Sequence, residues 1–123
     1  MTSLDPDLDA MVDEWLTVPD LAERWGISVT AVRRVIEDRE LIAVRRGERK
    51  VLSVPAAFAA DSGPVSALKG TFTVLSDAGF DDAEIVRWLF TEDATLPGGA
   101  TPMAAIRAGF KTEVRKRAME EAF

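Results

Sequence analysis

The sequence of 123 residues contains no cysteine and no histidine. Without cysteine it forms neither a disulfide nor a thiolate metal site, and without histidine it lacks the commonest general base and metal ligand. Its clustered carboxylates are more typical of a helix start (Asp81, Asp82, Glu84) and of a loop (Glu92, Asp93) than of a catalytic or calcium site. We therefore expect a protein that is not an enzyme, with no cofactor and no metal.

Long apolar runs are also absent. No stretch approaches the roughly 18 apolar residues that a membrane span needs. The N-terminal segment MTSLDPDLDAMVDEW is acidic and contains no apolar signal core. We expect a cytoplasmic protein with no membrane segment. A chain of 123 residues, 47% of them hydrophobic, suffices for one compact domain or for a small domain with a helical extension.

The formal net charge of -6 is unevenly distributed along the chain. Residues 1–23 contain seven acids and no base, whereas residues 24–50 contain eight bases against four acids. The remaining residues are weakly acidic. Because local charge decides what a surface attracts, the basic stretch is a candidate site for a polyanion. The acidic segment directly before it is expected to compete for the same basic surface.

Two short helices are predicted next to this boundary, after a possible short helix around DLDAMVDEW. Thr17 can cap the first helix, from about residue 18 to 25, with Asp20 completing a capping-box pattern. Gly26 suits a tight helix exit because glycine tolerates positive φ. Ser28 can cap a second helix that runs to about Arg39.

The residue types at fixed offsets match a helix-turn-helix core, in which two helices cross at a steep angle. Apolar residues are required on the facing sides, a small residue at the crossing and glycine at the turn. We expect Ile27 to fill the space beneath the turn. The seven positions that fit are Leu21, Ala22, Trp25, Gly26, Ile27, Val32 and Val35.

A β-hairpin is predicted next. LIAV (41–44) and KVLSV (50–54) are typical of two short strands around the turn RRGER, and Pro55 ends the second strand. The segment RRGERK then projects basic side chains like the wing of a winged helix-turn-helix, along the DNA backbone or into the minor groove.

The outward residues of the second helix and of the hairpin form the predicted DNA-binding site. Arginine can pair with the O6 and N7 acceptors of guanine or with phosphates, and a helix N-terminus favours a phosphate. The predicted site comprises Ser28, Thr30, Arg33, Arg34, Arg45, Arg46, Arg49 and Lys50. The alternative is that Arg33, Arg34 and Arg39 form ordinary surface pairs with the neighbouring carboxylates Glu37, Asp38 and Glu40.

The small-residue segment AADSGP (59–64) separates this half from a second, helical half. Helical spacing of apolar residues predicts helices within 65–80 and 81–92, separated by Gly79, with Asp81 as a cap. DATLPGGATP is a loop. Thr101 and Pro102 begin a further helix, and the charged tail KTEVRKRAMEEAF is also helical.

Two segments of the sequence resemble an actinobacterial family of small winged helix-turn-helix DNA-binding proteins, known as substrates of a membrane serine/threonine kinase. They are LTVPDLAERWGISVTAVRRVIEDRELIAVRRGERKVLSVPAAF and LKGTFTVLSDAGFDDAEIVRWLFTEDATLPG. The first half also resembles MerR and excisionase winged helices. The resemblance implies DNA binding through the second helix and the wing. In that family, phosphorylation occurs in an N-terminal tail that contains threonine. In this sequence Thr2 is the one threonine before Thr17.

The segment RWLFTEDATLPGGATPMAAIRAG is similar to the toxin-binding domain of Xre/MbcA/ParS antitoxins. That similarity implies a protein partner. An apolar cluster there either completes the core, the more typical outcome, or contacts the partner. The cluster comprises Trp88, Leu89, Phe90 and Leu96.

The sequence therefore predicts a mainly α protein with a small β-hairpin wing. Its expected parts are an acidic lead-in (1–14), a winged helix-turn-helix domain (15–60) and a helical C-terminal domain (61–123). The expected function is sequence-specific binding of double-stranded DNA as a transcriptional regulator, with a homodimer plausible because one small unit buries little DNA surface. The alternative is an antitoxin-like or adaptor protein whose C-terminal helices bind a protein partner.

Overall fold

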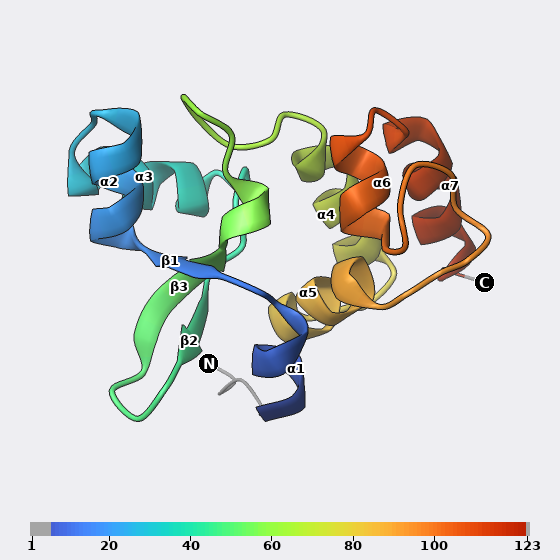
Figure 1. The fold of residues 1–123 in the computed structure, drawn as a ribbon, viewed down its shortest axis with the longest axis horizontal. Helices are drawn as coiled ribbons and strands as arrows, with labels where there is room; N and C mark the ends of the chain where they lie inside the picture. The colour runs from blue at the N-terminus through green and yellow to red at the C-terminus, as the bar shows by residue number, and fades with distance from the viewer. Residues whose placement is uncertain (1–5, 123) are drawn as a thin grey trace. The chain divides into compact units, whose positions relative to one another are not determined.

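A computed structural model describes residues 6–122, so Thr2 lies outside the described residues. The chain divides into two compact units, the first ending at Ser66 and the second beginning at Ala67 (Figure 1). The division falls just beyond the predicted boundary at residue 60. The small-residue segment stays with the first unit because Ala59 and Pro64 form a β-bridge and the Val65 N–H donates to the Phe58 carbonyl.

The described part of the acidic lead-in, from Pro6 onward, belongs to the first unit. Helix α1 spans Pro6–Met11, and strand β1 spans Trp15–Thr17. The predicted helix around DLDAMVDEW is therefore wrong beyond Met11. Trp15 lies on a strand because its backbone pairs with Pro55, far along the chain, a constraint that the local spacing does not contain.

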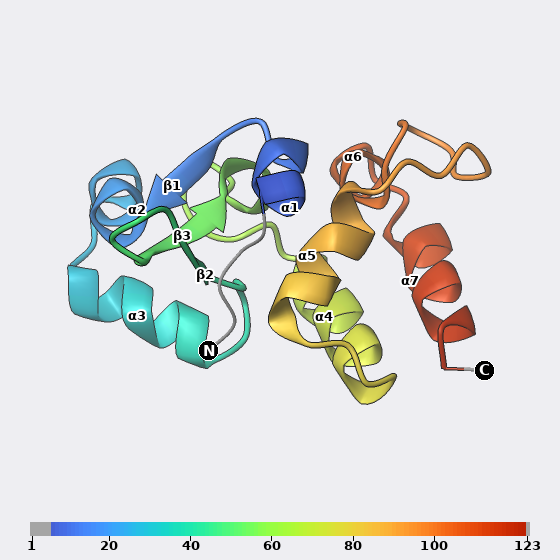
Figure 2. The same cartoon turned by 90° about the horizontal axis from the view of Figure 1, so that it is seen from below.

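The helix-turn-helix forms as predicted from α2 (Val18–Trp25) and α3 (Val29–Glu37), which cross steeply in both views (Figure 2). The capping box of Thr17 and Asp20 is present: the Asp20 N–H donates to Thr17 Oγ1, and the Thr17 N–H donates to Asp20 Oδ2 at 2.9 Å. Gly26 ends α2 with φ of 65°, a left-handed conformation that other L-residues adopt at a cost.

Helix α3 ends at Glu37, two residues before the predicted end. Arg39 has a φ of 63°, which takes it out of the helix, and the Glu40 N–H donates to the Val35 carbonyl across the helix end. This is the backbone pattern that commonly closes a helix, here with arginine in the place that glycine usually takes.

The three strands form an antiparallel sheet in the order β1-β3-β2, with β2 at Val44–Arg46 and β3 at Val51–Pro55. A 3₁₀ turn, η1, follows at Ala56–Phe58. The second strand was predicted correctly to within a residue, but the first was not. Leu41 and Ile42 are fully buried and precede the strand, so apolar character there reflects the core rather than strand pairing.

In the described part of the first unit (6–66), seven large apolar side chains are fully buried: Leu8, Leu21, Val32, Leu41, Ile42, Val54 and Phe58. Trp25 is partly buried, and its indole N–H donates to the Ala60 carbonyl at 2.8 Å. The prediction for Ile27 is wrong: its side chain is 40% exposed and does not fill the space beneath the turn. The Ile27 N–H instead closes the turn by donating to the Ala22 carbonyl.

Four helices build the described part of the second unit (67–122): α4 (Leu68–Asp77), α5 (Asp82–Phe90), α6 (Pro102–Arg107) and α7 (Lys111–Glu120). Asp81 caps α5 in a reciprocal capping box with Glu84, and Thr101 caps α6. The carboxylates Asp81 and Glu84 thus stabilise a helix start, as their positions indicated. The predicted fold class is confirmed. Within residues 6–122, no helix combines the length and apolarity that crossing a bilayer requires.

Candidate nucleic-acid interface

Helix α3 presents a polar, basic face to solvent. Ser28 caps it, its hydroxyl oxygen accepting from the Ala31 N–H at 3.0 Å. Thr30, Arg33 and Arg34 are exposed, while Val32 on the opposite side is fully buried. The burial of Val32 fixes the rotation of the helix, so the exposed side chains are held outward by the core beneath them.

Arg33 and Arg34 have no carboxylate partner among the residues that the structure describes. Among residues 6–122, no ion pair or side-chain hydrogen bond involves either guanidinium. The alternative in which both arginines form surface pairs is therefore not what the structure shows for these two residues. Arg39, by contrast, is engaged in an interaction. Two adjacent uncompensated guanidiniums on an exposed helix are suited to bases or phosphates.

The two arginines of β2 point to opposite faces of the sheet. Arg46 is paired with Val51 and Arg45 with Leu52, and successive strand residues alternate between faces. Both therefore lie on a strand and not, as predicted, in the hairpin turn. The turn itself is Gly47–Lys50, closed by the Lys50 N–H donating to the Gly47 carbonyl at 3.1 Å.

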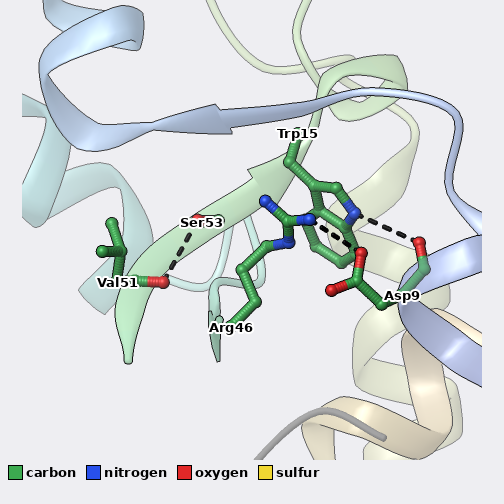
Figure 3. Close-up of polar contacts among 5 residues, drawn as sticks. All are labelled: Asp9, Trp15, Arg46, Val51 and Ser53. Carbon is green, nitrogen blue, oxygen red and sulfur yellow. Dashed lines mark hydrogen bonds and ion pairs between the residues drawn. The ribbon is translucent and has the colours of Figure 1, made fainter. Parts of the chain in front are cut away.

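Arg46 is held against the acidic helix α1. Its Nη2 donates to Asp9 Oδ1 at 2.7 Å, and its guanidinium carbon lies 5.1 Å from the centroid of the Trp15 ring (Figure 3). The Trp15 indole N–H in turn donates to the Asp9 carbonyl. Sequence reasoning missed Asp9 and Trp15 as partners of Arg46, because no local pattern links residues so far apart. The one signal was the adjacency of acidic and basic segments.

The remaining wing cations lie at the hairpin end. Arg49 and Lys50 are exposed, and Arg45 Nη1 donates to the Lys50 carbonyl at 3.0 Å, which fixes the arginine along the turn. An open hollow of about 390 Å³ lies here between the hairpin and α1, with three cations on its wall. Its lining is Pro6, Asp9, Arg45, Arg46, Gly47, Glu48 and Lys50. Positive charge outweighs negative in it, which favours an anion.

The predicted partner-binding cluster of the second unit is only partly available. Leu89 is fully buried and Leu96 is 7% exposed, so both belong to the core and not to a contact surface. They are buried because apolar residues of a small helical unit must cover one another. Trp88 and Phe90 are partly exposed, and the Trp88 indole N–H donates to Glu121 Oε1 at 3.1 Å.

A steep helix pair joined by a left-handed glycine and followed by a basic hairpin in a three-stranded sheet defines a winged helix-turn-helix protein. Residues 3–59 match the family model described as "DNA-binding protein Rv2175c, wHTH domain". Residues 65–122 match the model described as "Rv2175c C-terminal domain of unknown function". The chain belongs to the Rv2175c family.

Two comparisons, one with the sequence and one with the structure of Rv2175c, support this assignment. The chain is 35% identical to the DNA-binding protein Rv2175c of Mycobacterium tuberculosis, in an alignment that covers 98% of this chain and 85% of that protein. The NMR structure of Rv2175c superposes with a TM-score of 0.77 at 31% identity, covering 100% of this chain and 89% of the other. The resemblance to the actinobacterial winged helix-turn-helix family is thereby confirmed, whereas the similarity to MerR and excisionase winged helices is not shown.

Proposed function

We propose that this protein binds double-stranded DNA through α3 and the β2–β3 hairpin and acts as a transcriptional regulator. The observation that carries the proposal is the pair Arg33 and Arg34, exposed on α3 and, within residues 6–122, free of carboxylate partners. The match to the wHTH model and the name of the relative from Mycobacterium tuberculosis support it.

In this proposal α3 enters the major groove. Arg33 and Arg34 read base edges, where a guanidinium can donate two hydrogen bonds to guanine. The Thr30 hydroxyl contacts a base or the backbone beside them. Ser28 lies at the helix N-terminus, where the helix dipole favours a phosphate.

The hairpin supplies the second contact. Arg45, Arg49 and Lys50 lie along the backbone or enter the minor groove, where they neutralise phosphates and release counterions. Arg46 joins them only when it leaves Asp9. DNA phosphates and the carboxylate of Asp9 therefore compete for the guanidinium of Arg46. The competition that we expect from the acidic lead-in acts through this contact.

One small unit on a chain of net charge -6 buries little DNA, so two copies on adjacent half-sites would raise the affinity. A homodimer on DNA is accordingly part of the proposal. A protein partner for the second unit is the other candidate. It is supported by an open hollow of about 300 Å³ beside the partly exposed Trp88, but it loses two of its four predicted contact residues to the core.

The test is a titration of a fluorescent duplex by the full chain at 50 and 200 mM salt. Because each neutralised phosphate releases counterions, the proposal predicts an affinity that falls steeply with salt, by tenfold or more for three or four phosphate contacts. Affinity that does not depend on salt, or an absence of binding to any duplex in a random-sequence pool, would contradict the proposal.

A further inference from the structure

Two apolar side chains are exposed at the start of α3, the helix that carries Arg33 and Arg34. Ile27 is 40% and Val29 39% exposed, and they flank the capping residue Ser28. Of the large apolar side chains in residues 6–122, the others with comparable exposure are Val51, Phe110 and Met119. Ile27 and Val29 are the pair that lies within three residues of one another.

The fold leaves Val29 uncovered although its helix is anchored elsewhere. Val32 is fully buried, so the core already fixes α3 without using Val29. A β-carbon built on the neighbouring Gly26 would meet no atom within 4 Å, so the chain leaves open space at the turn. Keeping two branched apolar side chains in water gains nothing for folding, and a second apolar surface would stabilise them.

The position of Val29 defines what that surface is. Val29 and Arg33 are four residues apart on a helix, so they are neighbours on one face. If Arg33 reaches a base in the major groove, Val29 reaches the adjacent base. The apolar group that base edges present there is the C5 methyl group of thymine.

We propose that Val29, with Ile27 beside it, is a specificity-determining residue that contacts a thymine methyl group next to the base read by Arg33. The inference rests on the proposed DNA binding and adds the identity of one base. Guanidiniums give the helix its affinity for polyanions, and the apolar pair discriminates thymine from cytosine and from unmethylated uracil.

The test begins with selection of duplexes from a random pool by the full wild-type chain. Each thymine of the selected site is then replaced in turn by deoxyuridine, which loses only the methyl group and keeps the base pair. We expect one replacement to weaken binding about threefold to fourfold, the effect of burying a single methyl group. The variant Val29→Ala is expected to bind the thymine site as weakly as the wild type binds the uracil site, and to lose sensitivity to the replacement.

The control variant is Met119→Ala, which truncates an apolar side chain that is 48% exposed on α7 of the second unit. It should retain the full sensitivity to uracil. Circular dichroism establishes that each variant is folded. A site in which no thymine is enriched, a wild type indifferent to every replacement, or a Val29→Ala variant as sensitive as the wild type would overturn the inference while DNA binding stands. If no duplex is bound at all, the proposed function fails and this inference fails with it.

Discussion

The guanidinium of Arg46 is shared between a carboxylate and an aromatic ring: it lies 2.7 Å from Asp9 Oδ1 and 5.1 Å from the centroid of Trp15. Its strand neighbour Arg45 points to the other face of the sheet and donates to the Lys50 carbonyl. Arg46 thus joins the wing to the acidic helix α1 by an ion pair. That pair makes the acidic lead-in a participant in the properties of the wing.

Removing the charge of Asp9 should tighten DNA binding. The Arg46–Asp9 pair is about one-third exposed on each side, so it is worth no more than roughly 1 kcal/mol. Asp9→Asn is therefore expected to raise the affinity for a duplex by about twofold to fivefold. The measurement is fluorescence anisotropy with a labelled duplex at low salt.

The control for that variant is Asp7→Asn, which removes the same charge from an exposed position of α1. It should change the affinity for DNA less, because it alters the net charge of the protein without removing the ion pair with Arg46. Adding Arg46→Ala to Asp9→Asn should abolish the gain. Equal gains from Asp7→Asn and Asp9→Asn would show that net charge, and not the contact with Arg46, limits binding.

Arg45 and Arg46 should differ in their contributions to affinity. The pair with Asp9 lowers what Arg46 can contribute, because its guanidinium must part from that carboxylate before it contacts DNA, whereas Asp9→Asn leaves the bond of Arg45 to the Lys50 carbonyl unchanged. We expect Arg45→Ala to weaken binding more than Arg46→Ala in an otherwise wild-type chain. The same titration, repeated in the Asp9→Asn background, should show the two losses converge. Identical losses in both backgrounds would be inconsistent with this assignment.

The turn between α2 and α3 should depend on Gly26. Its φ of 65° is left-handed, so Gly26→Ala is expected to lower the free energy of unfolding by about 1–2 kcal/mol in urea denaturation. Gly63→Ala is the matched control, because Gly63 also has open space around it but has no left-handed φ. That substitution should be neutral or slightly stabilising. A Gly26→Ala variant as stable as the wild type would argue against the helix-turn-helix geometry.

The loop before α6 should show a pH signature. The hydroxyl of Thr95, and then its backbone N–H, donate to Asp93 and lower the pKa of that carboxyl below 3.8. Because the pKa of Asp93 is lower in the folded chain than in the unfolded chain, these hydrogen bonds stabilise the fold at pH values above the unfolded pKa. This stabilisation is lost as the pH falls through the folded pKa. NMR titration should therefore place Asp93 below ordinary aspartates, and Thr95→Ala should raise its pKa. An unchanged pKa in that variant would contradict the hydrogen bonds.

Features encoded by neighbouring residues were predictable from the sequence. The capping boxes of Thr17 with Asp20 and of Asp81 with Glu84 formed, because each involves residues three apart. The glycine turn at Gly26 formed for the same reason. Apolar periodicity also located α4 and α5, although Val65 lies outside α4.

Features that depend on distant residues were not predictable. Strand β1 exists because Trp15–Thr17 pairs with Ser53–Pro55, and nothing in a three-residue segment reports that partner. The burial of Leu41 and Ile42 was mistaken for a strand pattern, since a short apolar run has no distinguishing period. The pairing of Arg46 with Asp9 was not predictable either. The charge composition shows that an acidic segment precedes a basic one, but it does not show which side chains form an ion pair.

The central claim is that the guanidiniums of α3 contact nucleic acid, and a comparison at equal net charge tests it most directly. Arg33→Ala with Arg34→Ala removes two charges from α3, whereas Lys69→Ala with Lys111→Ala removes two from exposed positions of the second unit. Duplex titrations across salt concentrations should show a loss of tenfold or more and a smaller salt slope for the arginine variant, with a minor change for the lysine variant. Equal behaviour of the two variants would contradict the account.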